Sequence, residues 1–139
     1  MIDGETGWYF IHTSVKVAIF NGAKTLLALN PRDEWELVGG WPTADDESLE
    51  ETARREASEE TGLELGELRL AHATLFEPVP TKKVVLVIYA AELSSAYQLI
   101  LSEEHVSLQW FHVADLPANL SEEYEQSIRR GYRILNPQL

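Results

Sequence analysis

The stretch from residue 47 to residue 63, ESLEETARREASEETGL, constrains the fold of this chain more than any other. It begins with Ser48, which can cap a helix, and Glu51 three residues later completes a capping box. It ends at Gly62, the residue type that commonly follows the last turn of a helix. Its apolar side chains recur every four residues, at Leu49, Ala53 and Ala57. The pattern predicts a helix that packs through one narrow apolar stripe.

The same helix carries three glutamates, Glu56, Glu59 and Glu60, on one face and within one turn. Like charges at these spacings repel each other by about 0.2–0.5 kcal/mol per pair on an exposed helix. A divalent cation removes this repulsion, because it makes the clustered carboxylates its ligands. Oxygen ligands suit Mg²⁺ or Mn²⁺ better than zinc or copper. The alternative interpretation is an acidic face that points into water, which is the usual environment of a run of charges.

The residues around these glutamates follow a specific spacing. Glu47 is followed by seven residues and then by Arg55-Glu56-Ala57-Ser58-Glu59-Glu60-Thr61-Gly62-Leu63. This string resembles the Nudix box, whose pattern is Gly, five residues, Glu, seven residues, Arg-Glu, an apolar residue, any residue, Glu-Glu, any residue, Gly and an apolar residue. Every defined position from Glu47 onward matches. A match of this length rarely arises by chance, so the chain is identified as a member of this family.

One position departs from the pattern. The box has a glycine six residues before its first glutamate, and that position here is Trp41. Gly39 and Gly40 stand just upstream, so the simplest account is one extra residue in the loop 41–46. This loop leads into the acidic helix. The extra residue therefore affects the metal-facing backbone more than it affects the carboxylates.

The resemblance implies a fold, a cofactor and a set of site residues. The fold is an α/β/α sandwich with a mixed β-sheet, and the cofactor is Mg²⁺ or Mn²⁺. The implied metal-binding groups are Glu56, Glu59, Glu60 and a backbone carbonyl at Gly40, or at Gly39 in the neighbouring register. Glu56 either binds metal or accepts the proton of the attacking water, and Arg55 orients the glutamates. Glu47 fixes the loop, and Glu104 corresponds to a further glutamate in a later loop of many members, with a solvated loop carboxylate as its alternative.

Length and charge limit the remaining classes of function. The 139 residues suit one domain, residues 1–139. The net charge of −12 and the pI of about 4.6 argue against nucleic-acid or anionic-membrane binding. A polyphosphate substrate is compatible with this charge, since bound metal ions reverse the local sign. The chain has no cysteine, and its N-terminus lacks the pattern of a signal peptide, so we expect a cytoplasmic protein, with a homodimer among the open oligomeric states.

The rest of the chain predicts strands and a second helix. We expect strands at residues 12–20, 24–29, 35–38, 68–76, 83–92 and 105–113. Asn21-Gly22 predicts a hairpin, Gly39-Gly40 is compatible with a tight turn, and residues 77–81 with a break. The segment 94–102 is a connector. Ser121 caps a final helix whose sheet-facing side chains are Tyr124, Ile128 and Tyr132.

Several residues outside the box are further candidates for substrate contacts. Cations that could reach phosphate oxygens are Arg32, Lys82 and Lys83, each of which is otherwise a solvated charge. Aromatic side chains that could stack on a base are Trp35, Trp41 and Phe76, although packing is the alternative, above all for Trp35 and Phe76. His105 stands beside Glu104 and could approach the site. Pro78 lies where ADP-ribose-type members of the family carry a proline.

The sequence thus predicts a metal-dependent pyrophosphohydrolase that acts on a nucleoside diphosphate linked to another group X. A (deoxy)nucleoside triphosphate is preferred as the substrate, followed by ADP-ribose or a nucleotide sugar. The first alternative is a nucleotide-binding module that has lost catalysis through the changed loop at Trp41. The second is a plain metal-binding domain with no affinity for nucleotides.

Overall fold

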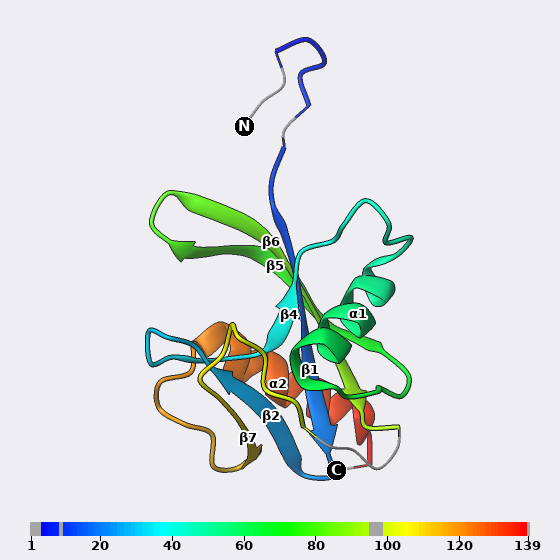
Figure 1. Cartoon of the computed structure of the whole chain (residues 1–139), viewed down its shortest axis with the longest axis vertical. Helices are drawn as coiled ribbons and strands as arrows, with labels where there is room; N and C mark the ends of the chain where they lie inside the picture. Colours follow the sequence, from blue (N-terminus) through cyan, green and yellow to red (C-terminus); the bar gives the residue numbers. More distant parts are fainter. Residues whose placement is uncertain (1–3, 9, 95–98, 139) are drawn as a thin grey trace.

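The computed structural model describes residues 4–8, 10–94 and 99–138, which form a seven-stranded sheet and two helices (Figure 1). The strands are β1 (Thr13–Asn21), β2 (Lys24–Leu29), β3 (Trp35–Glu36), β4 (Val38–Gly40), β5 (Arg69–Val79), β6 (Lys82–Glu92) and β7 (Ser107–His112). The helices are α1 (Leu49–Thr61) and α2 (Glu122–Leu135). None of the described helices combines the length and the apolar character that crossing a membrane requires.

Strand β1 organises the sheet, and the sheet divides beside it. It pairs in parallel with β6, from Thr13↔Val85 to Phe20↔Glu92, and β6 pairs antiparallel with β5. On its other side β1 pairs with β2 next to the Asn21-Gly22 turn, and then β4 takes the place of β2. Strand β2 pairs with β3 and β7 instead. The two halves of the sheet therefore separate at β4, directly ahead of the acidic helix.

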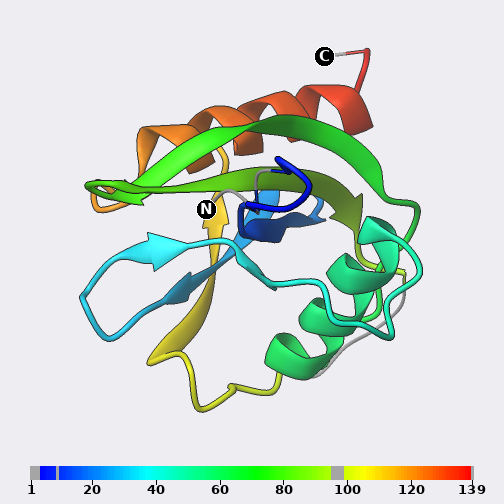
Figure 2. The same ribbon diagram turned by 90° about the horizontal axis from the view of Figure 1, so that it is seen from above.

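The two helices cover opposite faces of this mixed sheet (Figure 2). Helix α1 packs against β4 and β1, and α2 packs against β5, β6 and β1. The core on the α1 side joins Val15 and Val17 to Ala57, whereas the core on the α2 side joins Phe20 to Ile128. The alternation of β1 sends successive apolar side chains to the two faces. The predicted α/β class, a mixed sheet between helices, is confirmed.

Helix α2 also matches its prediction. Ser121 is the N-cap, and its hydroxyl accepts a hydrogen bond of 3.2 Å from the backbone N–H of Tyr124. Ile128 is fully buried, and Tyr124 and Tyr132 pack against the same apolar cluster. Side chains four residues apart therefore fix this helix on the sheet.

The predicted strand at residues 35–38 was wrong, and of the two interpretations of Gly39-Gly40 the tight turn is excluded. The expected strand 35–38 is two short strands, β3 and β4, which pair with different neighbours. Gly39 and Gly40 form no tight turn, because both lie in β4, opposite Lys16 and Val15. Glycines are required there by close approach rather than by a turn, since a Cβ on Gly39 would collide with the carbonyl oxygen of Val15.

The predicted break at residues 77–81 was also placed too early. Strand β5 continues through Pro78 to Val79, with an irregular register between Phe76 and Val79. The turn follows at Pro80 and Thr81, where Thr81 adopts a φ of 72°. Proline is tolerated in β5 because this strand lies at the edge of the sheet and leaves one row of backbone groups unpaired. Of the expected connector 94–102, residues 95–98 lie outside the described chain.

The contact between α2 and the sheet leaves no room for a side chain at Gly131. A Cβ there would lie 2.8 Å from the Cβ of Ala90. We expect Gly131→Val to lower the free energy of unfolding by about 1–3 kcal/mol, because it overpacks this contact. Urea denaturation measures the change, with Arg133→Val on the exposed side of the same helix as the control. Equal effects of the two substitutions would contradict the close packing described here.

Candidate active site

Helix α1 begins and ends where the sequence predicts. The hydroxyl of Ser48 accepts a hydrogen bond of 3.0 Å from the backbone N–H of Glu51. The carboxylate of Glu51 accepts one of 3.0 Å from the backbone N–H of Glu47. Gly62 closes the helix in the left-handed conformation, with φ of 76°, and its N–H donates to Ser58. The helix is therefore fixed at both ends, and its glutamates hold a defined orientation.

Small residues let α1 approach the sheet closely. Ala53 and Ala57 are fully buried against the β1 and β4 side of the core. Gly40 presents a bare Cα to the helix, since a Cβ on it would overlap the carboxylate of Glu56. The narrow apolar stripe therefore brings the charged face of α1 against the backbone of β4.

The carboxylate of Glu60 is buried at this contact. Glu60 is 4% exposed, and its Oε2 accepts a hydrogen bond of 2.9 Å from the backbone N–H of Gly39. Gly39 has a φ of 150°, which favours glycine and turns this N–H toward the helix. Burial raises the pKa of Glu60 to about 7, and a hydrogen bond with Glu104 acts in the same direction.

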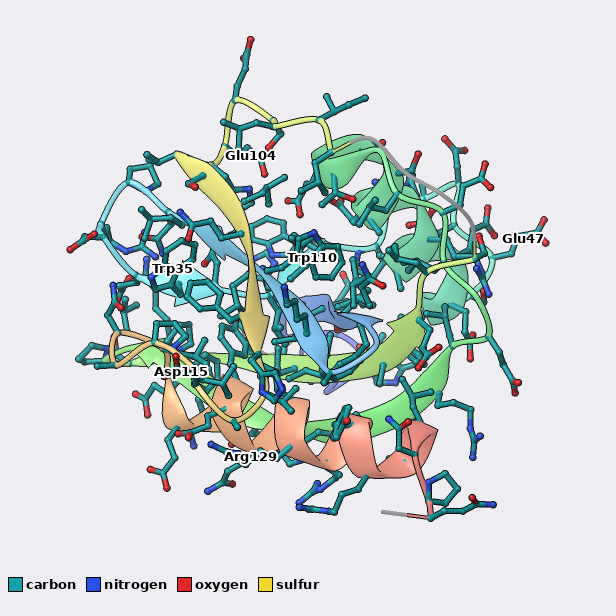
Figure 3. The ribbon with its side chains drawn as sticks, turned by 90° about the horizontal axis from the view of Figure 1, so that it is seen from below. Trp35, Glu47, Glu104, Trp110, Asp115 and Arg129 are labelled. Atoms are coloured by element: carbon teal, nitrogen blue, oxygen red, sulfur yellow. The ribbon has the colours of Figure 1, made fainter. Side chains whose placement is uncertain are left out.

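Glu104 reaches the site from the other half of the sheet. It stands on the segment that leads into β7 (Figure 3). The next residue, His105, is buried, and its Nε2 lies 2.9 Å from Oε1 of Glu36 in β3. The hydrogen bond to Glu36 raises the pKa of His105. The His105–Glu36 contact therefore ties the loop that carries Glu104 to the sheet.

Arg55 lies across the remaining glutamates. Its Nη1 donates to Glu56 at 3.0 Å and to Glu59 at 3.4 Å. Its Nε and Nη2 donate to the two carboxylate oxygens of Asp46, at 3.1 and 2.8 Å. The hydrogen bond from Arg55 holds the pKa of Asp46 well below its usual range. One guanidinium thus contacts three carboxylates.

A pocket of about 380 Å³ opens between β3, β5 and the start of α2. Its aromatic wall is made by Trp35, Phe76 and Tyr124, and Pro78 and Asn119 also line it. Trp35 packs edge-on against Phe111, with ring centroids 4.9 Å apart, and Phe76 packs against Tyr124 at 6.2 Å. Glu36 also lines the pocket and contacts His105, so the pocket adjoins the loop that carries Glu104.

The family model described as the NUDIX domain matches residues 11–131, most of the chain. The chain belongs to the Nudix family. The predicted family is therefore confirmed, and membership supports an enzyme of the Nudix hydrolase class. No curated protein matches the chain significantly.

Solved structures of other Nudix proteins share the fold. A MutT NUDIX hydrolase from Burkholderia pseudomallei is 23% identical with a TM-score of 0.74, and the match covers 88% of this chain and 98% of that one. An ADP-ribose pyrophosphatase from Streptococcus suis is 22% identical with a TM-score of 0.74, covering 94% and 96%. The NUDIX domain of Shewanella oneidensis NrtR, complexed with ADP ribose, is 21% identical with a TM-score of 0.76, covering 96% and 94%.

The structure brings most of the candidate Nudix residues together. Glu56, Glu59, Glu60 and Arg55 share one face of α1, Gly40 lies against Glu56, and Glu104 reaches Glu60. Glu47 lies apart, at the outer edge of the molecule beyond α1 (Figure 3). Within the described residues, no three acidic or histidine side chains already converge with the spacing of metal ligands.

Two residues of the site were missed by the sequence analysis. Asp46 was treated as part of the loop, although it stands six residues after Gly40, where the box pattern counted forward from that glycine expects an acid. Lys16 was counted as a strand residue, but its ammonium acts electrostatically on Glu36, Glu60, His105 and Tyr124. No local pattern marks Lys16, since its place depends on pairing with β4.

The remaining candidates for substrate contacts are exposed at the surface of the molecule. Trp41 is 60% exposed and stacks on His12, with ring centroids 4.7 Å apart, while its backbone oxygen accepts a hydrogen bond from Arg55. Arg32 lines the pocket but forms an exposed ion pair with Glu34 at 2.9 Å. Lys82 and Lys83 are exposed at the start of β6.

The raised pKa of Glu60 predicts a pH-dependent stability. Between pH 4.5 and 7 the folded state holds a proton that the unfolded state releases, so this contribution to stability is lost as the pH rises. The shift from 4.5 to about 7 corresponds to roughly 3 kcal/mol. In chelator, we expect Glu60→Gln to gain about this much relative to the native protein between pH 4.5 and pH 8.

Urea denaturation at both pH values measures this difference. Glu59→Gln is the control, because the side chain of Glu59 is 59% exposed. A native-minus-mutant difference that stays constant with pH would contradict the burial of the Glu60 carboxylate.

Proposed function

We propose that the chain is a metal-dependent pyrophosphohydrolase that cleaves a nucleoside diphosphate linked to a further group X. The observation that carries this proposal is the buried carboxylate of Glu60, which meets Glu104 from the opposite half of the sheet. Burying the charged form of the Glu60 carboxylate is costly, and a bound cation would offset that cost as well as a proton does.

The donor groups fit a hard divalent cation. Carboxylate oxygens come from Glu56, Glu59, Glu60 and Glu104, and Gly40 adds a backbone carbonyl at the end of β4. Such an oxygen set favours Mg²⁺ or Mn²⁺ over softer metals. A bound ion of this kind would supply Lewis-acid activation of the diphosphate and of the attacking water.

The side chains of α1 divide the remaining tasks. We assign metal binding first to Glu59 and Glu60, and to Glu56 either metal binding or acceptance of the water's proton. Arg55 orients Glu56 and Glu59 through its Nη1. Glu104 completes the site from the β7 side, and Glu47 contributes through the loop at the start of α1, where its N–H donates to Glu51.

The neighbouring pocket suits the nucleoside. Its aromatic wall offers faces and edges against which a base can stack, and its volume lies in the range of small-molecule sites. The candidates for stacking are Trp35 and Phe76, both lining residues, whereas Trp41 is occupied by His12. A nucleoside in this pocket would direct its phosphates toward Glu36 and the glutamates of α1.

Lys16 is the cation best placed to meet those phosphates. Its side chain runs along Gly39, since a Cβ on that glycine would lie 2.8 Å from Cδ of Lys16. Burial raises the pKa of Glu60 and that of Tyr124, a pocket residue, and the charge of Lys16 opposes both rises. Within the described chain its ammonium forms none of the ion pairs.

The preferred substrate is a (deoxy)nucleoside triphosphate, followed by ADP-ribose or a nucleotide sugar. Fold neighbours include a MutT hydrolase and an ADP-ribose pyrophosphatase, so both classes belong in one substrate panel. Pro78 lines the pocket, which keeps ADP-ribose among the candidates.

Phosphate and pyrophosphate release from this panel, with Mg²⁺, with Mn²⁺ and with chelator, tests the proposal. We expect metal-dependent turnover of one substrate class, and Glu60→Gln should reduce it by orders of magnitude while the circular dichroism spectrum is unchanged. An equally active, folded Glu60→Gln protein would contradict the metal-site assignment. Tight nucleotide binding without turnover in the native protein would instead indicate an inactive binding module.

Lys16→Met tests the phosphate contact separately. We expect kcat/KM to fall about tenfold or more, since a charge-assisted hydrogen bond to phosphate is lost. The metal concentration at half-maximal rate should stay unchanged. Lys24→Met, which removes an exposed lysine of β2, is the control. If both variants kept native kcat/KM, Lys16 would have no role in substrate binding.

A further inference from the structure

Asp46 is a nearly buried carboxylate in an otherwise exposed loop. Its side chain is 4% exposed, whereas its neighbours Asp45 and Glu47 are exposed. Its oxygens accept four hydrogen bonds, from Nε and Nη2 of Arg55, from the Thr52 hydroxyl at 2.8 Å and from the Thr43 N–H at 3.0 Å. The loop is therefore built around this one side chain.

The contact with Arg55 is a two-point fork. Both carboxylate oxygens of Asp46 are engaged by different nitrogens of the same guanidinium, which fixes its plane as well as its position. The backbone oxygen of Trp41 holds Nη2 as well, at 3.1 Å. Nη1 then extends toward Glu56 and Glu59.

This arrangement limits how strongly Arg55 pairs with the glutamates. Arg55 carries one positive charge, and two of its three donor nitrogens are committed to Asp46. Without Asp46, the same fork could turn onto Glu56 and Glu59 and compete with a cation for their oxygens. Asp46 thus orients Arg55 and also keeps it from neutralising the site.

The extra residue in the loop explains why Asp46 occupies this place. Counted forward from Gly40, the box spacing reaches Asp46; counted back from Arg55, it reaches Glu47. The carboxylate that faces the helix is that of Asp46, while Glu47 projects at the edge of the molecule (Figure 3).

We infer that Asp46, rather than Glu47, is the positioning residue of this site, and that it holds Arg55 away from the glutamates so that they can bind a divalent cation. The inference rests on the proposed metal site but not on the identity of the substrate. It requires Asp46 to act through Arg55, which a purely structural role in the loop would not.

Mn²⁺ binding to the full chain, measured by calorimetry without nucleotide, tests the inference. We expect Asp46→Asn to weaken Mn²⁺ affinity about tenfold and to raise the metal concentration for half-maximal turnover similarly, with excess metal restoring most of kcat. Asp45→Asn, which removes the adjacent exposed charge, should bind Mn²⁺ like the native protein. Glu47→Gln should change the affinity less than Asp46→Asn.

A double-mutant cycle separates positioning from loop structure. In an Arg55→Gln background, Asp46→Asn should cause no further loss of Mn²⁺ affinity, since its effect passes through the arginine. Additive losses would overturn the inference, as would native affinity in Asp46→Asn or a larger loss in Glu47→Gln. If Asp46→Asn fails to fold, Asp46→Glu keeps the charge but displaces Arg55, and native affinity in that variant overturns the inference.

The failure of the proposed function looks different. A native protein that binds Mn²⁺ but hydrolyses no nucleotide contradicts the proposed activity. The Mn²⁺ affinities of the Asp46 variants still test the inference about Asp46 in that case. A native protein that binds no Mn²⁺ overturns both.

Discussion

The hydrogen bond from the Gly39 N–H to the buried carboxylate of Glu60 is the interaction on which the rest of the site depends. It requires a φ of 150° at Gly39, a bare Cα at Gly40 and the close approach of Ala57 on α1. Each of these residues is small for the same reason, because the charged face of a helix must lie directly on a strand. The narrow apolar stripe of α1 therefore stabilises the helix on the sheet, and its small residues also allow the site to form.

Charge is distributed around this contact in a way that suits a cation. The chain carries a net charge of −12, and Lys16 and Arg55 bring positive charge to the cluster. Arg55 is shared with Asp46, and Lys16 acts on both the glutamates and the pocket. The carboxylates are therefore held together without being fully neutralised, and a divalent ion would complete the balance.

Features encoded locally were predictable from the sequence, and features that depend on distant pairing were not. The caps at Ser48 and Gly62 and the Asn21-Gly22 turn use neighbouring residues, so the element boundaries there were found. The family pattern supplied the glutamates. The sequence left the glycines of β4 open between a tight turn and a metal-binding carbonyl, because their requirement comes from Val15 and Glu56, far away in sequence. Asp46 was missed for a similar reason, since spacing alone does not decide which acid faces Arg55.

The most direct test of the central claim is anomalous diffraction from crystals grown with Mn²⁺. We expect a manganese peak bounded by carboxylate oxygens of Glu59 and Glu60 and by the backbone carbonyl of Gly40, with Arg55 still on Asp46. Manganese bound elsewhere, with the Glu60 carboxylate still on Gly39 and no peak beside α1, would contradict the claim that this helix face is the metal site.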